Sequence, residues 1–312
     1  MLSLLWIACG LVGLWLGSKL ALRGTLEVAE RRNLSQGFLG VTVLAVGTDL
    51  PEVLVAVTGG LHQLAGAEAS GVVVGNAVGS ALTQGSLVLG LAGLFGHLHM
   101  SRHTLRRDGT VLLLATALLA FLATGSQVTR FEGGVLLAVY AIYAWTLRAE
   151  ERSRPRAGVV PWRRLLRSLA AIGGGLAIVL GSAELVVESA LHLSGTFGWN
   201  QTVIGLFLIG AGTSLPELAL SLGAVVKGRA ALAVGNVIGS NVFDLLVPVG
   251  LSAVLHPLGV ERLTLVMDLP AVAVVSMLGL LFFARARGLQ RGEALVLVGV
   301  FFAYSLTRIV LL

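Results

Sequence analysis

The sequence is poor in charged residues, and this shortage is its first informative feature. Only 12% of its 312 residues are Asp, Glu, Lys or Arg, whereas 56% are hydrophobic. A soluble globular domain typically carries about 25% charged residues. The composition therefore argues against a soluble domain and indicates a membrane protein.

Several other features are missing. The single cysteine, Cys9, excludes an internal disulfide and a cysteine metal cluster. The chain has no nucleotide-binding motif, which argues against an ATP-driven pump, and no Gly-x-Gly-Asp or Gly-x-Ser-Gly motif of an intramembrane protease. We therefore expect neither an enzyme nor a cofactor. The N-terminal apolar run has no basic n-region, so we expect it to be a retained first helix.

Long apolar stretches are abundant. A transmembrane helix needs about 20 mostly apolar residues. Ten segments meet this requirement: 3–22, 37–60, 71–98, 109–126, 131–148, 165–192, 200–225, 230–255, 263–284 and 293–311. The sequence therefore predicts an all-α polytopic membrane protein with ten transmembrane helices.

The net charge of +6 is explained by the loops in which the basic residues lie. If the N-terminus is extracytoplasmic, most of the 22 basic residues fall in cytoplasmic loops, and Arg130 and Arg262 fall on the opposite side. Positive charge accumulates in the cytoplasmic loops of membrane proteins. We therefore predict a multi-pass protein of the cell (inner) membrane with both termini extracytoplasmic. The expected partners are small cations and the lipid bilayer, with no nucleic acid and no obligatory protein partner.

The second half of the chain repeats the first. "VGTDLPEV" (46–53) returns as "AGTSLPEL" (211–218), and "VGNAVGSALTQGSLVLG" (74–90) returns as "VGNVIGSNVFDLLVPVG" (234–250). Each copy holds five predicted helices, so the second copy must cross the membrane in the opposite sense. Inverted repeats are typical of secondary transporters, whose site lies at the membrane midplane where the repeats meet.

The predicted organisation therefore has three parts. Residues 1–150 form the first five-helix repeat, and residues 165–312 form the second, inverted repeat. Between them, residues 151–164 are polar, basic and proline-containing, which predicts a cytoplasmic linker.

The first repeated motif places a helix breaker and an acid inside an apolar segment. Pro51 and Pro216 each remove a backbone donor, so we expect each helix to be broken at the midplane with exposed carbonyl groups. Hard oxygen ligands of this kind suit Ca²⁺ and Na⁺. The motif side chains that add oxygen are Thr48, Glu52, Thr213 and Glu217.

The second repeated motif adds further oxygen atoms. Ser80 and Gln84, like Ser240 and Asp244, are four residues apart and so share one helix face. An ionised carboxylate near the bilayer centre costs about 2.5–3.5 kcal/mol even on lenient scales. Acids from both halves therefore require bound cations or protons, and we predict one cation site built by the two halves.

These paired motifs resemble the signature repeats of the calcium/cation antiporter superfamily, and they are most similar to its sodium/calcium exchanger branch over the whole chain. The resemblance implies exchange of Ca²⁺ for Na⁺ by alternating access at a shared site, and a sliding gate made from the first helix of each half. The cation ligands that it implies are the Ala45 carbonyl, Thr48, Glu52, Ser80, the Gly210 carbonyl, Thr213, Glu217, Ser240 and Asp244.

Two positions depart from the family pattern. The family usually has Ser after the motif Thr, as at Ser214, but the first copy has Asp49; it usually has Asn or Asp where the first copy has Gln84. Either Asp49 faces the site and holds a proton, K⁺ or an extra Na⁺, or it faces a helix interface. Asp49, Ser214 and Gln84 complete the candidate site, and a proton-coupled exchanger of Ca²⁺ or another divalent cation is the alternative function.

Three acids outside the motifs are expected to have structural roles. Asp108 and Asp268 lie near the starts of predicted helices and are expected to be N-caps. Glu184, inside the sixth predicted helix, is expected to have a structural or vestibule role.

Overall fold

The computed structural model describes residues 2–29, 45–151, 162–285 and 288–311. The elements of the first half are α1 (Leu2–Ala29), α3 (Ala45–Thr48), α4 (Leu50–Leu64), α5 (Ser70–Thr83), the π-helical turn η3 (Gln84–Val88), α6 (Leu89–Phe95), α7 (Arg102–Leu122), the 3₁₀ turn η4 (Ala123–Gly125), β1 (Gln127–Val128) and α8 (Arg130–Glu151).

The second half begins with the long helix α9. Its elements are α9 (Trp162–Phe197), α10 (Gln201–Val203), the π-helical turn η5 (Ile204–Ile209), α11 (Gly210–Thr213), α12 (Leu215–Val226), α13 (Ala230–Leu255), β2 (Leu258–Gly259), the π-helical turn η6 (Thr264–Asp268), α14 (Leu269–Ala284) and α15 (Arg291–Val310). The short strands β1 and β2 pair antiparallel and tie the two halves together at one end of the helices.

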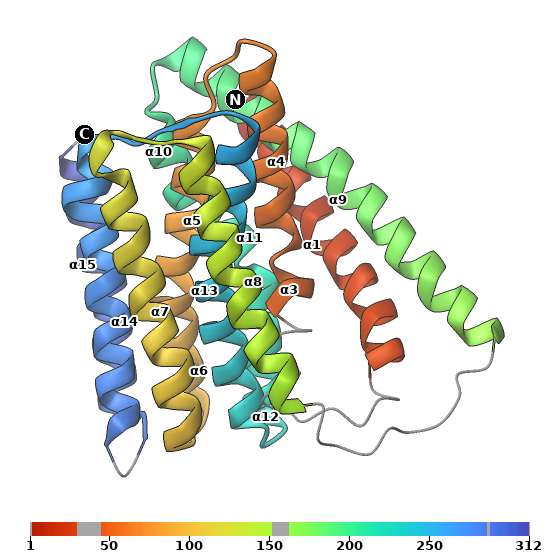
Figure 1. Cartoon of the computed structure of the whole chain (residues 1–312), viewed down its shortest axis with the longest axis vertical. Helices are drawn as coiled ribbons and strands as arrows, with labels where there is room; N and C mark the ends of the chain where they lie inside the picture. The colour runs from red at the N-terminus through yellow and green to blue at the C-terminus, as the bar shows by residue number, and fades with distance from the viewer. Residues whose placement is uncertain (1, 30–44, 152–161, 286–287, 312) are drawn as a thin grey trace.

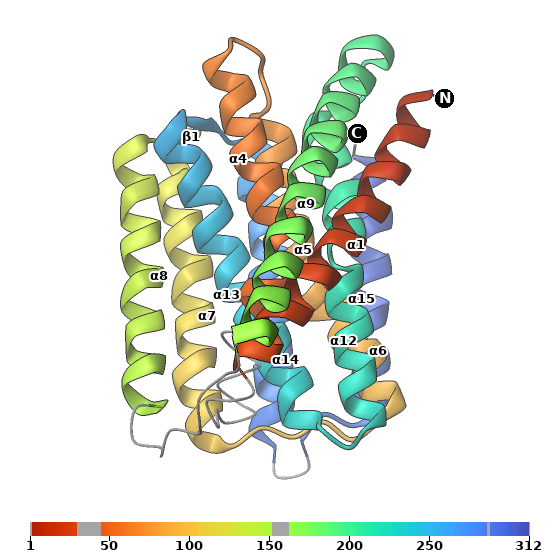
Figure 2. The same cartoon turned by 90° about the vertical axis from the view of Figure 1, so that its right-hand side faces the viewer.

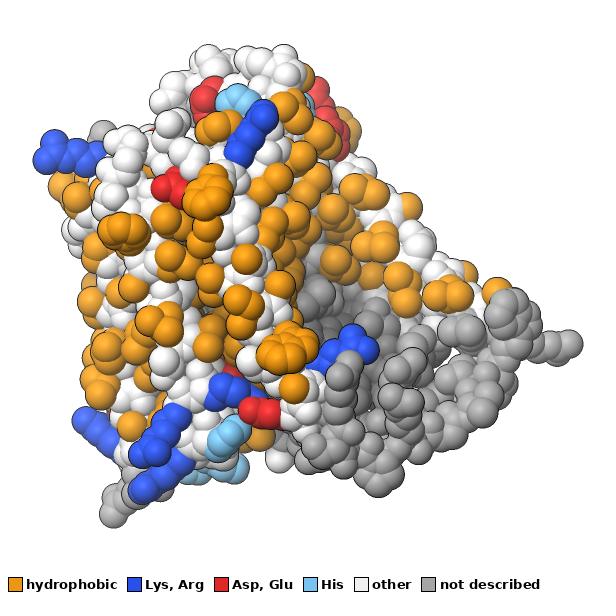
Figure 3. Space-filling model, in the orientation of Figure 1, with side chains coloured by type: hydrophobic (Ala, Val, Ile, Leu, Met, Phe, Trp, Pro, Cys, Tyr) orange, Lys and Arg blue, Asp and Glu red, His pale blue; other side chains and the backbone are white. Residues whose placement is uncertain are grey.

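The apolar helices expected from the composition are present. Within the described residues, eight helical stretches are long and apolar enough to cross a membrane. Large apolar side chains such as Phe121, Phe131 and Trp145 point outward, and hydrophobic side chains cover the long sides of the molecule in Figure 3. Such a surface suits lipid rather than water. The predicted all-helical class is therefore confirmed.

The count of ten spans stays a prediction. The start of the second predicted span lies in residues 30–44, outside the described residues, and only α3 and α4 of that segment are described. Helix α8 corresponds to the fifth predicted span and has 22 residues, but it is not one of the eight stretches above.

The two halves run in opposite directions. Helix α4 rises from the interior to the end of the molecule that carries both termini, whereas α12 descends from the interior to the other end (Figures 1 and 2). The predicted inversion is therefore observed. Helices α5 and α13, which carry the second repeated motif, are the most buried of the long apolar stretches.

Small residues let α5 approach the second half closely. A Cβ atom added to Gly75 would lie 2.4 Å from the Thr202 carbonyl oxygen, and one added to Gly79 would lie 2.3 Å from the Leu206 carbonyl oxygen. Backbone contact at this distance is possible only without a side chain. The glycines therefore bring α5 of one half directly against η5 of the other.

Helices α1 and α9 form an antiparallel pair that leans away from the other helices (Figure 1). Their apolar residues, such as Ile7 and Leu14, form a cluster distinct from the main core, and this cluster also includes Val55 of α4, Val72 of α5 and Ile209 of η5. A Cβ atom on Gly17 would lie 2.8 Å from the Gly175 carbonyl oxygen, so the two backbones touch. The pair packs chiefly on itself and only to a lesser extent on the central helices.

Glu184 of α9 connects this pair to α4. Its Oε1 lies 2.9 Å from Nε2 of His62, which belongs to α4. The side chain of Glu184 is 56% exposed, so the contact lies near the surface.

The N-cap expectation is wrong for Asp108, whereas Asp268 holds the N-cap position of α14 but makes no capping hydrogen bond. Asp108 lies inside α7, whose N-cap is Ser101, and it accepts hydrogen bonds from Arg107 and from Tyr143 at 3.0 Å. Asp268 closes the turn η6 with helical backbone angles and makes no side-chain cap bond. Each helix begins earlier than the sequence pattern indicated, so both carboxylates are free for tertiary contacts.

Candidate cation site

The first repeated motif breaks a helix in each half. Asp49 separates α3 from α4 with φ −82° and ψ 9°, and Ser214 separates α11 from α12 with φ −78° and ψ 2°. In both copies the proline follows within the first turn of the second helix segment. The predicted interruption is therefore present twice with the same backbone geometry.

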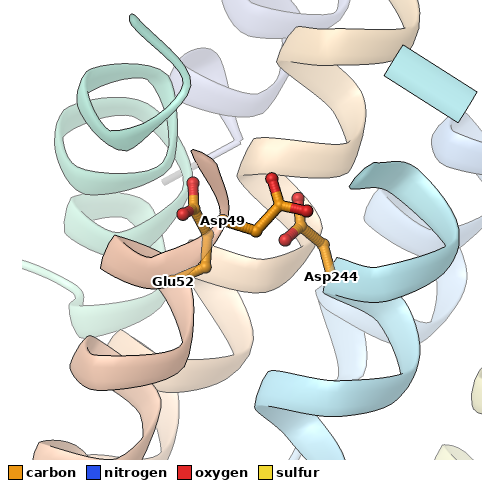
Figure 4. Close-up of side chains that lie close together, drawn as sticks. All are labelled: Asp49, Glu52 and Asp244. Atoms are coloured by element: carbon orange, nitrogen blue, oxygen red, sulfur yellow. The ribbon is translucent and has the colours of Figure 1, made fainter. Parts of the chain in front are cut away.

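Three buried carboxylates meet at the first of these breaks. One oxygen atom from each of Asp49, Glu52 and Asp244 lies within 4.8 Å of the other two, and all three residues are fully buried. Asp49 comes from the helix break, Glu52 from the first turn of α4 and Asp244 from the middle of α13. Figure 4 shows Asp49 between the other two, with its carboxylate turned toward Asp244. We call these residues the acid cluster.

Glu217 lies beside the acid cluster rather than within it. It is fully buried in the first turn of α12 and is close enough to interact electrostatically with Asp49, Glu52 and Asp244. Its carboxylate lies next to the side chains of Asp49 and Thr48, although neither oxygen meets the geometric criteria for a hydrogen bond. The sequence grouped Glu217 with Glu52 and Asp244, whereas Asp49 is the third member of the closest set.

Hydroxyl groups join the two halves next to Glu52. The Ser80 hydroxyl lies 3.2 Å from Glu52 Oε1, 3.2 Å from the Gly210 carbonyl oxygen and 3.2 Å from Thr213 Oγ1. A hydroxyl has only one proton to donate. This region therefore offers more oxygen acceptors than donors, which favours a bound cation.

Gln84 reaches across to the other half. Its Nε2 donates to Asp244 Oδ2 at 3.0 Å, and its Oε1 has no partner among the described residues. Gln84 begins the π-helical turn η3, whereas the matching Asp244 lies within the continuous helix α13. Such π-bulges occur often at functional sites, because they redirect side chains. Ser240, one turn before Asp244, is also fully buried, and its hydroxyl has no described partner.

The other candidate residues lie at the two breaks. Ala45 and Thr48 begin and end α3, and Thr48 is buried. Ser214 is buried as well, but its hydroxyl donates to the Gly210 carbonyl oxygen at 2.8 Å. Ser214 is therefore satisfied within its own half.

One polar residue in this region was missed by the sequence analysis. Asn76 of α5 is fully buried, and its Oδ1 accepts from Thr213 Oγ1 at 3.2 Å. The sequence did contain a signal for it, because the same Val-Gly-Asn triplet recurs with Asn236 in the second copy.

The chemistry of the site follows from its surplus of acceptors. The buried oxygens without a hydrogen-bond partner among the described residues are both of Asp49, Glu52 Oε2, Gln84 Oε1, both of Glu217, Ser240 Oγ and Asp244 Oδ1. Buried carboxylates without partners are costly unless they are neutralised. An all-oxygen set of this kind fits hard cations such as Na⁺ and Ca²⁺.

Comparisons with known proteins agree over the whole chain. The sequence model of the family described as "Sodium/calcium exchanger protein" matches residues 2–148 and 167–310. The sodium/calcium exchanger MaX1 of Methanosarcina acetivorans is 26% identical, over 97% of this chain and 97% of that protein. The inner membrane protein YrbG of Escherichia coli is 31% identical, over 85% of this chain and 84% of that protein.

A solved structure shares the fold. The sodium-calcium exchanger NCX_Mj, soaked with 2.5 mM Na⁺ and 10 mM Sr²⁺, matches with a TM-score of 0.70 and 28% identity. The match covers 97% of each chain.

Proposed function

The chain belongs to the sodium/calcium exchanger protein family, and from this premise we propose that it exchanges Ca²⁺ for Na⁺ across the membrane by alternating access at one shared site. It is a multi-pass membrane antiporter and not an enzyme. The observation that carries the proposal is the acid cluster, with Glu217 beside it, buried where the two inverted halves meet.

A shared site explains coupling without ATP. The carboxylates need positive charge whichever end of the site is open, because burying them ionised and unpaired is costly. Ca²⁺ takes six to eight oxygen ligands at about 2.3–2.6 Å, so it would use the same oxygens that Na⁺ uses. The two ions then exclude each other, and each crosses only when the other returns.

The proposed ligands come from both halves. The first half supplies the Ala45 carbonyl, Thr48, Asp49, Glu52, Ser80 and Gln84; the second supplies the Gly210 carbonyl, Thr213, Ser214, Glu217, Ser240 and Asp244. The burial of these side chains supports this assignment, as do the oxygens without a described hydrogen-bond partner on Asp49, Glu52, Gln84, Glu217, Ser240 and Asp244.

The α1–α9 pair is the proposed gate. The pair packs chiefly on itself, and its contacts with the central helices include apolar ones such as those to Val55 of α4 and Ile209 of η5, which suits sliding as a unit. Its position also suits this role, since a Cβ atom on Gly212, next to the second helix break, would lie 2.6 Å from Leu11 of α1. Sliding of α1 would therefore change access to the break.

The proposed orientation places both termini outside the cytoplasm in the inner membrane. Both termini lie at one end of the molecule, with Arg130 beyond β1 at that same end (Figure 1). The opposite end carries the short loops that follow α6, α12 and α14; Lys227 and Arg285 lie in these loops, and Arg102 begins α7 at the end of the first. The positive-inside rule supports the cytoplasm on that side.

A proton-coupled Ca²⁺ exchanger is the second candidate. The observation that favours it is Asp49, an additional carboxylate within 4.8 Å of Asp244. Two acids at this distance can share a proton, and release of that proton would make room for a divalent cation.

The deciding experiment is ⁴⁵Ca²⁺ uptake into proteoliposomes loaded with Na⁺ and diluted into Na⁺-free buffer. Uptake should require internal Na⁺ and persist with a protonophore. Glu217→Gln should abolish it, because Glu217 lies beside the acid cluster. Glu132→Gln is the matched control, since this glutamate caps α8 through Thr129 away from the site. Uptake that ignores Na⁺ but follows an imposed pH gradient would reject Na⁺ exchange in favour of proton coupling.

A further inference from the structure

Asn76 of α5 is a buried amide outside the set of proposed ligands. The residue is fully buried, and the one hydrogen bond of its side chain to a described residue is accepted by Oδ1 from Thr213 Oγ1 at 3.2 Å. Its Nδ2 has no partner among the described residues. Burying an amide with incomplete hydrogen bonding is costly. A single bond to a hydroxyl of the proposed site therefore points to a role in that site rather than in packing.

Close backbone packing fixes the place of Asn76. A Cβ atom added to Gly205 would lie 2.8 Å from the Asn76 amide nitrogen, and one added to Gly210 would lie 2.9 Å from the Asn76 carbonyl oxygen. Both glycines belong to the second half, and Gly210 begins the short helix α11 that Thr213 ends. The backbone of α5 thus touches the segment that carries Thr213, and it presents the Asn76 amide to the Thr213 hydroxyl.

The Thr213 hydroxyl has one proton to donate and several acceptors close by. Asn76 Oδ1 and Ser80 Oγ each lie at 3.2 Å, the Gly210 carbonyl oxygen lies at 3.3 Å, and the Glu52 carboxylate is also close. All of these acceptors except Asn76 are proposed cation ligands. A proton donated to one of the ligands would compete with the cation for that oxygen. Donation to Asn76 leaves the ligand oxygens, together with the lone pairs of Thr213, to the cation.

We propose that Asn76 is a positioning residue for cation binding: it accepts the Thr213 proton and so turns the lone pairs of Thr213 Oγ1 toward the ion. This inference rests on the proposed exchange function. The matching residue of the second half, Asn236 of α13, is also buried, but neither polar atom of its amide has a hydrogen-bond partner among the described residues. The positioning role therefore belongs to Asn76 and not to its counterpart.

The test is a double-mutant cycle in ⁴⁵Ca²⁺ binding to the purified protein. Asn76→Ala removes the acceptor, and Thr213→Val removes the hydroxyl while keeping the shape of the side chain. Asn76→Ala should weaken Ca²⁺ binding by about 2- to 12-fold, which is the range of a neutral hydrogen bond. In the Thr213→Val background the same substitution should have no further effect, because residues that act through one another are not additive.

Two further variants separate positioning from packing. Asn236→Ala is the matched control, since it removes a similarly buried amide without a described hydrogen bond, and it should change the Ca²⁺ affinity by less than about twofold. Asn76→Asp keeps the size of the side chain and an acceptor oxygen, so it should bind Ca²⁺ at least as tightly as the wild type. This variant also decides the question should Asn76→Ala fail to fold.

Three results would overturn the inference. The first is an effect of Asn76→Ala that is equally large with and without the Thr213 hydroxyl, as a merely structural role requires. The others are equal losses in Asn76→Ala and Asn236→Ala, and weaker Ca²⁺ binding by Asn76→Asp. Failure of the proposed function is distinct, because it appears as Ca²⁺ uptake that ignores internal Na⁺, whereas the cycle measures Ca²⁺ binding alone.

Discussion

The ion pair between Arg308 and Asp268 allows a quantitative test of the packing. Arg308, near the end of α15, is fully buried and is the largest fully buried side chain among the described residues. Its Nε donates to Asp268 Oδ1 at 2.9 Å, and Tyr304 donates to the same oxygen at 2.7 Å. The nearest other acid is Glu261, whose Oε2 lies 3.7 Å from Nη2.

Arg308→Leu should be strongly destabilising. The substitution leaves the fully buried Asp268 with only the tyrosine hydroxyl as a partner. Removal of one member of a buried ion pair costs about 3–5 kcal/mol. Asp268→Leu should cost a similar amount, because it leaves the Arg308 guanidinium with only the 3.7 Å contact to Glu261. Two independent substitutions would therefore sum to about 6–10 kcal/mol.

The double variant Asp268→Leu/Arg308→Leu should be far less destabilised than this sum. Both charges are then absent, and replacement of a buried pair by apolar groups is often neutral. What remains is the Tyr304 hydroxyl without its acceptor, which costs about 1–3 kcal/mol. Adding Tyr304→Phe should recover this last cost.

The assay is the free energy of unfolding in detergent, measured by denaturant titration with circular dichroism for the two single variants, the double variant and the triple variant. Additive losses in the double variant would refute the buried pair. So would a loss below about 1 kcal/mol in either single variant, since that is the range of an exposed salt bridge.

Three further predictions concern the site and the gate. Gly79→Ala should abolish Ca²⁺ uptake and lower the melting temperature, because its Cβ would meet a backbone oxygen at 2.3 Å. The control Gly134→Ala, whose Cβ would meet no atom within 4 Å, should change neither quantity. Equal behaviour of the two variants would contradict the close approach of α5. Gln84→Leu removes the hydrogen bond that orients Asp244 and also removes the unpartnered amide oxygen. It should weaken Ca²⁺ binding by about 10- to 150-fold, the range of hydrogen bonds to charged groups, in a titration of the purified protein. Unchanged affinity would show that Gln84 does not shape the site. Gly17→Leu should separate α1 from α9 and stop Ca²⁺ uptake, while the purified protein should still bind Ca²⁺. Normal uptake by this variant would rule out the α1–α9 pair as the gate.

The helix breaks could be read from the sequence because their cause is local. A proline removes a backbone donor wherever it stands, so Pro51 and Pro216 marked both breaks. The inversion followed from the odd number of helices per repeat. Neither inference needed to know which helices are neighbours.

The direction of side chains at the breaks could not be predicted. Helical periodicity places a residue on a face only inside a regular helix. Asp49 lies between two helices, so the sequence left it facing either the site or an interface. The capping bond expected of Asp268 is absent for a related reason, because its partners Tyr304 and Arg308 come from a distant helix.

The difference between Asp49 and Ser214 bears on the energetics of the two facing states. If the inverted halves were identical, the outward- and inward-facing conformations would be related by symmetry and equally populated. One half has an acid at its break and a π-helical turn at Gln84, whereas the other has a hydroxyl and an uninterrupted α13. In the proposed alternating-access cycle the two conformations then differ in free energy, so we expect the empty protein to rest facing one side. We then expect ions arriving from the two sides of the membrane to meet unequal apparent affinities, so that exchange is faster in one direction than in the other.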